Sequence, residues 1–153
     1  MIHFSNVSKR FSQTGDALQD VSLQIDAGEF VFHTGHSGAG KSTLLKIIAL
    51  MERVTKGQVI VGGLNLGQIP RAKVPLYRRN IGMVFQNHRL LMDRTVFNNV
   101  ALPMVIAGHR HQDIARRVRA ALDKVGLLRK ENSLPVQLSG GEQQRVEIGR
   151  AHV

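Results

Sequence analysis

Hydrophobic and polar residues alternate along parts of the first half of the chain, and this spacing predicts β-strands. Neighbouring side chains of a strand point to opposite faces, so alternation is typical of a strand with one buried face. Three segments have strand patterns: residues 2–7, 21–25 and 58–61. Thr14, Gly15 and Asp16 have turn composition and separate the first two. Two further apolar runs, residues 29–34 and 81–85, indicate short buried strands.

Helical spacing dominates later in the chain. Residues 43–51 predict a helix that is apolar on nearly every side, as a buried helix would be. Further helices are expected at residues 94–107 and 112–125 and from about Gly140 onward. Pro103 should kink or end the first of these three, while Gly108 and Gly126 interrupt the connections. The fold class is therefore α/β, and its expected parts are a β-rich core at residues 1–86, a helical portion at 87–138 and a last helix at 139–153.

Residues 35–42 read G-x-x-x-x-G-K-S, which is the phosphate-binding P-loop. Glycines allow a tight loop whose N–H groups turn toward phosphate oxygens, and the following helix adds its positive dipole end. Lys41 supplies charge to the β- and γ-phosphates, and the Ser42 hydroxyl is a Mg²⁺ ligand. The flanking apolar segments argue against a chance glycine-rich turn. The residues expected to bind nucleotide are Gly35, His36, Ser37, Gly38, Ala39, Gly40, Lys41, Ser42 and Thr43.

Composition limits the other classes of protein. The 153 residues, 42% of them hydrophobic, suffice for one domain with a core. The sequence has no cysteine, which excludes disulfides and thiolate metal sites, and we expect no signal peptide and no membrane span. The net charge of +10 suits nucleic acid or an anionic membrane surface. However, many basic residues fall on the polar face of the helix at 112–125, and aromatic residues are sparse, so a nucleic-acid partner is not expected.

A second motif occupies residues 138–145, which read L-S-G-G-E-Q-Q-R. Together with the P-loop it resembles the signature of ATP-binding-cassette (ABC) ATPases, P-loop NTPases with a small antiparallel β part and a helical subdomain. Ser139, Gly140 and Gly141, followed by Glu142 and Gln143, would offer a hydroxyl and N–H groups at a helix N-terminus. The resemblance implies a homodimer in which two cassettes enclose two ATP molecules, each P-loop facing the partner's signature.

The resemblance assigns roles to two further residues. Phe11 lies where the family has an aromatic ring that stacks on adenine, although a core phenylalanine at a strand end is an equal alternative. Gln86 matches the Q-loop glutamine, which reaches Mg²⁺ and the attacking water and reports the nucleotide state to a transmembrane partner. The implied cofactors are ATP and Mg²⁺.

Four segments narrow the resemblance to a cell-division branch of the family: residues 35–46, 78–86, 90–96 and 120–128. This branch implies a polytopic transmembrane partner at the cytoplasmic face of the inner membrane, at the division septum. There, ATP turnover would activate cell-wall hydrolases. The alternatives are a lipoprotein or amino-acid ABC transporter, a DNA-linked ABC ATPase, and a nucleotide-binding fragment without catalysis.

The chain departs from the family pattern after the signature helix. The family continues with an apolar strand ending in Asp-Glu and, later, a switch histidine, and residues 1–153 contain neither. Asp93 follows an apolar run, but Arg94 comes next and the run precedes the signature. We therefore expect a C-terminally incomplete cassette that hydrolyses ATP poorly and exposes apolar surface. The last helix also contains Glu147, Gly149 and His152, at positions where the family prefers small or apolar residues.

Overall fold

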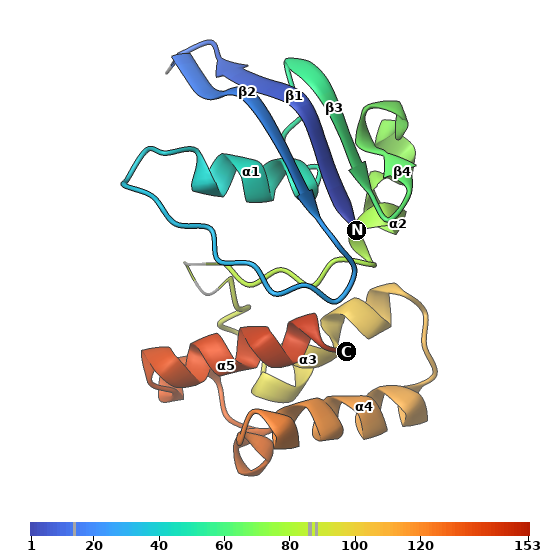
Figure 1. Cartoon of the computed structure of the whole chain (residues 1–153). Helices are drawn as coiled ribbons and strands as arrows, with labels where there is room; N and C mark the ends of the chain where they lie inside the picture. Colours follow the sequence, from blue (N-terminus) through green and yellow to red (C-terminus); the bar gives the residue numbers. More distant parts are fainter. Residues whose placement is uncertain (14, 86, 88) are drawn as a thin grey trace. The chain divides into compact units, whose positions relative to one another are not determined.

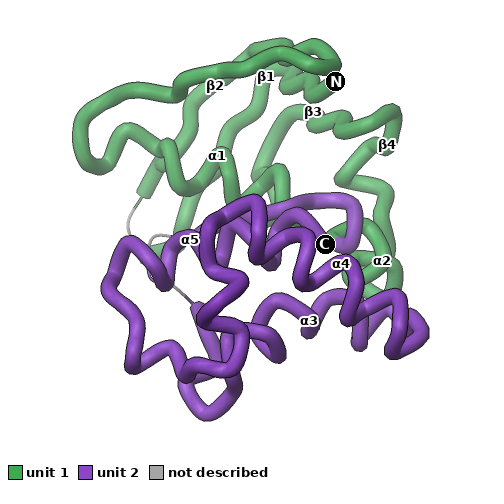
Figure 2. The backbone as a smooth tube through the Cα atoms, turned by 90° about the horizontal axis from the view of Figure 1, so that it is seen from below, with its two compact units in different colours: residues 1–78 green, residues 79–153 purple. Residues whose placement is uncertain are grey.

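The computed structural model describes residues 1–13, 15–85, 87 and 89–153. The chain forms two compact units, Met1–Arg78 and Arg79–Val153, which are coloured separately in Figure 2. Each unit is described by itself.

The first unit contains an antiparallel sheet in the order β2-β1-β3-β4 (Figure 1). Its strands are β1 (Ile2–Phe11), β2 (Gly15–Ile25), β3 (Lys56–Val61) and the short β4 (Leu64–Asn65). In the register, Phe4 pairs with Leu23 of β2 on one side and with Val59 of β3 on the other. Phe4 and Val59 are buried, as alternation requires. The three strands expected from alternation are confirmed.

Helix α1 (Lys41–Ile48) belongs to the first unit and buries one face only. Leu44 and Ile47 are buried, but Leu45 is 50% exposed, so the expectation of a helix buried on nearly every side was wrong. The carbonyl groups at the end of α1 are satisfied by side chains of α2 (Val74–Arg78). The Tyr77 hydroxyl donates to Ile48 O at 2.5 Å, and Arg78 donates to Ala49 O and Leu50 O at 2.9 and 2.8 Å. Two 3₁₀ turns, η1 (Leu66–Gln68) and η2 (Arg71–Lys73), precede α2.

The two apolar runs expected as buried strands are not strands. Residues 29–34 have no regular secondary structure, and Phe30 and Phe32 are 82% and 81% exposed. Their rings contact each other edge to face, with centroids 5.0 Å apart. A strand needs a neighbouring backbone to complete its hydrogen bonds, and within the described part of the chain neither run has one. The second run, residues 81–85, packs in the helical unit instead.

The second unit is a helical cluster of α3 (Val96–Ile106), α4 (His111–Lys124) and α5 (Gly140–Ala151), with 3₁₀ turns η3 (Leu128–Lys130) and η4 (Pro135–Gln137). The three expected helices are confirmed. Pro103 lies inside α3, which continues to Ile106, and Gly108 and Gly126 follow α3 and α4 with φ of +77° and +70°. The unit's core is built from all three helices and their connections: Leu90, Val96, Val100, Ala101, Met104, Ile114, Val118, Ala121, Leu122, Leu127, Leu138 and Val146.

Asn99 ties the start of α3 to the loop before it. Its side chain is fully buried. Its Oδ1 accepts from Leu91 N–H at 2.7 Å, and its Nδ2 donates to the carbonyl groups of Leu91, Arg94 and Thr95 at 3.0–3.1 Å. Because buried polar groups are costly unless bonded, this side chain fixes the loop's path into the helix.

The basic face of α4 is exposed, as expected for a solvated helix surface. Asp113 accepts hydrogen bonds from Arg110 and Arg116, and Glu131 accepts from Arg119. Hydrogen bonding and the charge of Glu131 raise the pKa of Arg119. Among the described residues, no helix has both the length and the apolar content to cross a bilayer.

The boundary between the two compact units falls after Arg78, whereas the β-rich part expected from the sequence extended to Gln86. Residues 79–85 join the second unit through contacts with its helices. Arg79 donates to Ile106 O at 3.4 Å, and Phe85 N–H donates to the Glu147 carboxylate at 3.1 Å.

Candidate nucleotide-binding site

The P-loop residues form an exposed loop that leads into α1. Gly40 is the N-cap residue, with φ +83° and no side-chain cap. The N–H groups of the first helical turn have no partner within the helix, so they and the helix dipole favour an anion at this end. A Cβ on Gly40 would lie 2.5 Å from Ala17 O on β2. Because glycine has no Cβ, the N-terminus of α1 can lie close to the backbone of β2 at this position.

Lys41 places its ammonium group inside the same loop. Its Nζ donates to Gly35 O at 2.5 Å and to His36 O at 2.7 Å. Ala39 N–H also donates to His36 O, at 3.2 Å, which closes a turn within the loop. The loop thus curls around a positive charge, and the Ser42 hydroxyl is exposed beside it on the first turn of α1.

The nine residues expected to bind nucleotide, 35–43, therefore lie together as one loop and helix start. Exposed N–H donors, an ammonium group and a hydroxyl form a donor set that fits a nucleotide phosphate with Mg²⁺. His36 makes a local contact, with Nδ1 2.8 Å from Ser37 O.

Phe11 and Gln86 are the other two residues proposed from the family resemblance. Phe11 is the last residue of β1 and is half-buried, with the Lys9 ammonium 4.6 Å from its ring centroid. Both of its alternatives, adenine stacking and a core role, remain predictions. Gln86 lies outside the described residues, so its proposed role at Mg²⁺ also stays a prediction.

The signature residues begin α5. Ser139 is its N-cap: the hydroxyl accepts from Glu142 N–H at 3.4 Å and donates to the Glu142 carboxylate at 3.0 Å, while Ser139 N–H donates to the same carboxylate at 2.9 Å. The Lys130 ammonium is 2.6 Å from Glu142. The hydrogen bond from Lys130, with those from Ser139, lowers the pKa of Glu142 to about 2. The Ser139 hydroxyl thus has its hydrogen directed at Glu142 in this structure.

The glycines after Ser139 are open to a ligand. A Cβ on Gly140 or Gly141 would meet no heavy atom within 4 Å. Gln143 has a structural contact, since its Nε2 donates to Pro135 O at 3.0 Å and Leu138 O at 3.3 Å. At the start of α5, the N–H groups near the two glycines form the accessible part of the signature.

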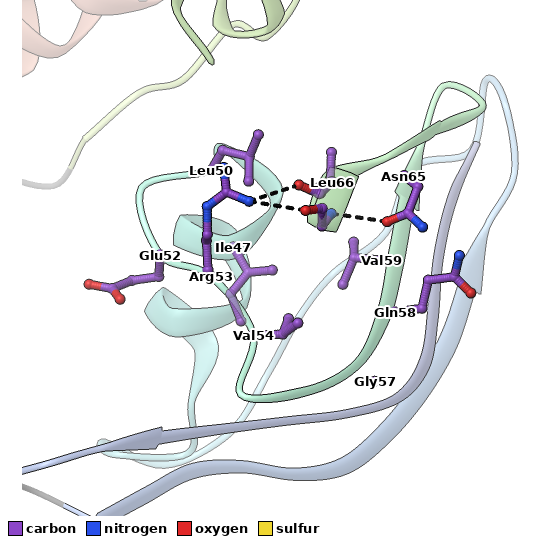
Figure 3. Close-up of a pocket in the computed structure, with 11 residues that line it drawn as sticks. Ile47, Leu50, Glu52, Arg53, Val54, Gly57, Gln58, Val59, Asn65 and Leu66 are labelled. Carbon is purple, nitrogen blue, oxygen red and sulfur yellow. Dashed lines mark hydrogen bonds between the residues drawn. The ribbon is translucent and has the colours of Figure 1, made fainter. Parts of the chain in front are cut away.

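A separate cavity lies in the first unit, and Figure 3 shows its lining. It has a volume of about 170 Å³ and is bordered by the end of α1, β3 and η1. Arg53 donates to the carbonyl groups of Leu66 and Gly67 across one side. None of residues 35–43 lines it, so it is not the phosphate site.

Within the described part of the chain, no cluster of three or more His, Asp or Glu residues could hold a metal ion. The histidines at 109 and 111 do not gather with Asp113, whose carboxylate binds Arg110 and Arg116 instead.

Sequence reasoning missed the role of Glu147. It is fully buried in α5, and its carboxylate accepts from the N–H groups of Phe85 and Arg89. Its unusual place in the last helix was noticed, but periodicity alone could not supply its partners. An arginine three residues later, Arg150, was the available signal for a paired buried carboxylate.

The loop around Lys41, the uncapped α1 N-terminus and the signature at the start of α5 define a P-loop ATPase of the cassette type. The ABC transporter family profile matches residues 18–153, and the chain belongs to this family. It is 56% identical over 153 residues to the cell division ATP-binding protein FtsE of Escherichia coli K12, covering all of this chain and 69% of that protein.

A second relative and a solved structure extend the comparison. The chain is 48% identical to the methionine import ATP-binding protein MetN 1 of Salmonella paratyphi A, covering 99% of this chain and 45% of that one. Among solved structures, the ATP-binding cassette MJ0796, a dimer in a post-hydrolysis state bound to ADP and Pi, superposes with a TM-score of 0.91 at 36% identity. That match covers 99% of this chain and 68% of the cassette.

Proposed function

We propose that this chain is the ATP-binding subunit of an ABC complex in cell division, with an FtsX-like transmembrane protein as its partner. The observation that carries ATP binding is the Lys41 ammonium enclosed by the P-loop at the uncapped start of α1. The cell-division role is supported by the 56% identity to FtsE along the whole chain.

In this proposal two copies enclose ATP and Mg²⁺ head to tail. The similarity to the cassette MJ0796, a dimer bound to ADP and Pi, supports the dimer. Lys41 and the loop N–H groups bind the phosphates, and Ser42 and Gln86 serve Mg²⁺. Ser139, Gly140 and Gly141 contact the γ-phosphate held by the other copy, and Phe11 stacks on adenine. The complex acts at the cytoplasmic side of the inner membrane at the division site, where it activates septal cell-wall hydrolases.

ATP binding can be tested with a lysine pair on one helix. Lys41→Met removes the ammonium group enclosed by the loop, whereas Lys46→Met removes an exposed ammonium group in the last turn of α1. We expect Lys41→Met to abolish most Mg·ATP binding in calorimetry and Lys46→Met to bind as the unaltered chain does. Equal affinities for the two variants would refute the site.

The partner is tested by co-purification from cells that express the full-length form with an FtsX-like protein. Recovery of the pair would support the cell-division role. Recovery with a methionine-import membrane subunit instead would favour the alternative suggested by the MetN relative.

Hydrolysis is a separate matter. Residues 1–153 contain no apolar strand ending in Asp-Glu after the signature helix. Phosphoryl transfer to water relies on positioning the nucleophile and stabilising charge, so we expect the purified 153-residue chain to bind ATP but turn it over poorly. Turnover equal to that of a full-length relative would contradict this expectation.

A further inference from the structure

The buried carboxylate of Glu147 contacts a segment far away in sequence. Its Oε2 accepts from Phe85 N–H at 3.1 Å, and its Oε1 accepts from Arg89 N–H at 3.0 Å and from Arg150 Nη2 at 2.8 Å. Glu147 has no exposed surface. A buried carboxylate is strongly unfavourable unless it is paired, so these charge-assisted bonds define where both ends of the 85–89 segment lie on α5.

Arg150 and Gly82 make two further contacts between α5 and the chain around residues 82–89. Arg150 Nη1 donates to Arg89 O at 2.8 Å, so α5 engages both backbone polar groups of Arg89. A Cβ on Gly82 would lie 2.7 Å from Ala151 O, which means that the backbone at Gly82 also runs close against the end of α5. The guanidinium of Arg89 lies 4.2 Å from the ring centroid of Phe85 and links the two ends of the segment.

We propose that Glu147 is a positioning residue that fixes the backbone on both sides of Gln86 to the signature helix. The inference rests on the proposed function, in which Gln86 serves Mg²⁺ and the signature serves the ATP of a second copy. Its anchor points are Phe85 and Arg89. The consequence is that the backbone at Phe85 and at Arg89 is held to α5, so a displacement of the helix reaches these two residues through direct bonds.

The first test measures amide hydrogen exchange at Phe85 and Arg89 in the 153-residue chain. Glu147→Gln keeps the side-chain volume but replaces one acceptor oxygen with an NH₂ group that faces a backbone donor. We expect exchange to become about tenfold faster or more at the amide that faces the NH₂ group, the effect of losing a hydrogen bond to a charged group, and to accelerate less at the other amide, which keeps a neutral acceptor. Amides of Val118 and Leu122 in the helical core should keep their protection, which shows that the change is local.

The matched control is Glu131→Gln, which removes a carboxylate from the same unit where it binds Arg119 near the surface. It should leave Phe85 and Arg89 unchanged. If Glu147→Gln does not fold, Gly82→Ala replaces it, because its Cβ would push the segment from Ala151 and should accelerate exchange at Phe85. Unaltered exchange at Phe85 and Arg89 in the folded variant would overturn the inference.

The second readout separates positioning from mere structural support. Affinity for ATP is measured with Mg²⁺ and with a chelator, for the unaltered chain, Glu147→Gln and Glu131→Gln. We expect Glu147→Gln to weaken Mg²⁺-supported binding by about fivefold or more and to leave Mg²⁺-free binding unchanged. Equal loss in both conditions, or no loss, would refute positioning. If the unaltered chain bound no ATP at all, the proposed function would fail, while the exchange result would still decide the anchor.

Discussion

Replacement of Gly40 by alanine tests how the P-loop is held in place. Gly40 has φ +83°, which costs a residue with a Cβ about 1–2 kcal/mol. The added Cβ would also lie 2.5 Å from Ala17 O and 2.7 Å from Leu18 Cδ2 on β2. Relieving such overpacking costs about 1–3 kcal/mol more. Gly40→Ala should therefore lower the free energy of unfolding of the first unit by about 2–5 kcal/mol, the sum of these two costs.

Gly38→Ala is the matched control. Gly38 has φ +84°, nearly the same backbone conformation, but a Cβ there would meet no heavy atom within 4 Å. Its cost should be the conformational part alone, about 1–2 kcal/mol. The difference between the two variants thus isolates the contact between the helix N-terminus and β2.

The assay is urea unfolding followed by the fluorescence of Tyr77, the single tyrosine of the chain. Tyr77 is buried in the first unit, where it binds the end of α1. For a slope of about 1–3 kcal/mol per molar urea, the midpoint of Gly40→Ala should lie about 1 M below that of Gly38→Ala. Equal midpoints would show that Gly40 does not seat α1 against β2, and the reasoning would be refuted.

Three further results are expected. Lys130 and Ser139 lower the pKa of Glu142 from 4.5 to about 2, so the contribution of this carboxylate to stability is complete above pH 4.5 and disappears as the pH falls toward 2. The thermal unfolding temperatures of Glu142→Gln and the unaltered chain should therefore differ at pH 6 and converge near pH 2. A difference that stays constant with pH would contradict this. Burial raises the pKa of Tyr77 to about 12, so tyrosinate absorbance of the folded chain should appear near pH 12, and appearance near pH 10 would contradict burial. Asn99→Ala removes the side-chain partner of Leu91 N–H and of Arg94 O, while Leu91 O and Thr95 O keep their backbone bonds to Arg94 N–H and Asn99 N–H. The change should cost about 2–4 kcal/mol in denaturant unfolding, whereas the exposed neighbour variant Asn98→Ala should cost less than about 1 kcal/mol, and equal costs would refute the role of Asn99.

Local pattern was sufficient for much of the fold. Alternation identified β1, β2 and β3, and helical spacing identified α3, α4 and α5, because these signals depend on which face of an element is buried. The glycine spacing before Lys41 located the loop and the start of α1, since each glycine allows a backbone conformation that other residues rarely adopt.

Features that depend on distant partners could not be predicted in this way. The run at residues 29–34 has strand composition, but strand pairing requires a neighbouring backbone, and composition does not provide one. Glu147 was noticed only as unusual, because its partners, Phe85 and Arg89, lie about sixty residues earlier. The bond of Ser139 to Glu142, by contrast, is local and follows the capping-box spacing.

The most direct test of the account is an amide NMR titration of the 153-residue chain with Mg·ATP. If the phosphates bind at the uncapped start of α1, the largest shifts should occur at Gly38, Gly40, Lys41 and Ser42, which lie in the loop and the first turn of the helix. Shifts confined to the cavity beside Arg53 and Leu66, or no shifts at saturating nucleotide, would contradict the assignment of this loop as the nucleotide site.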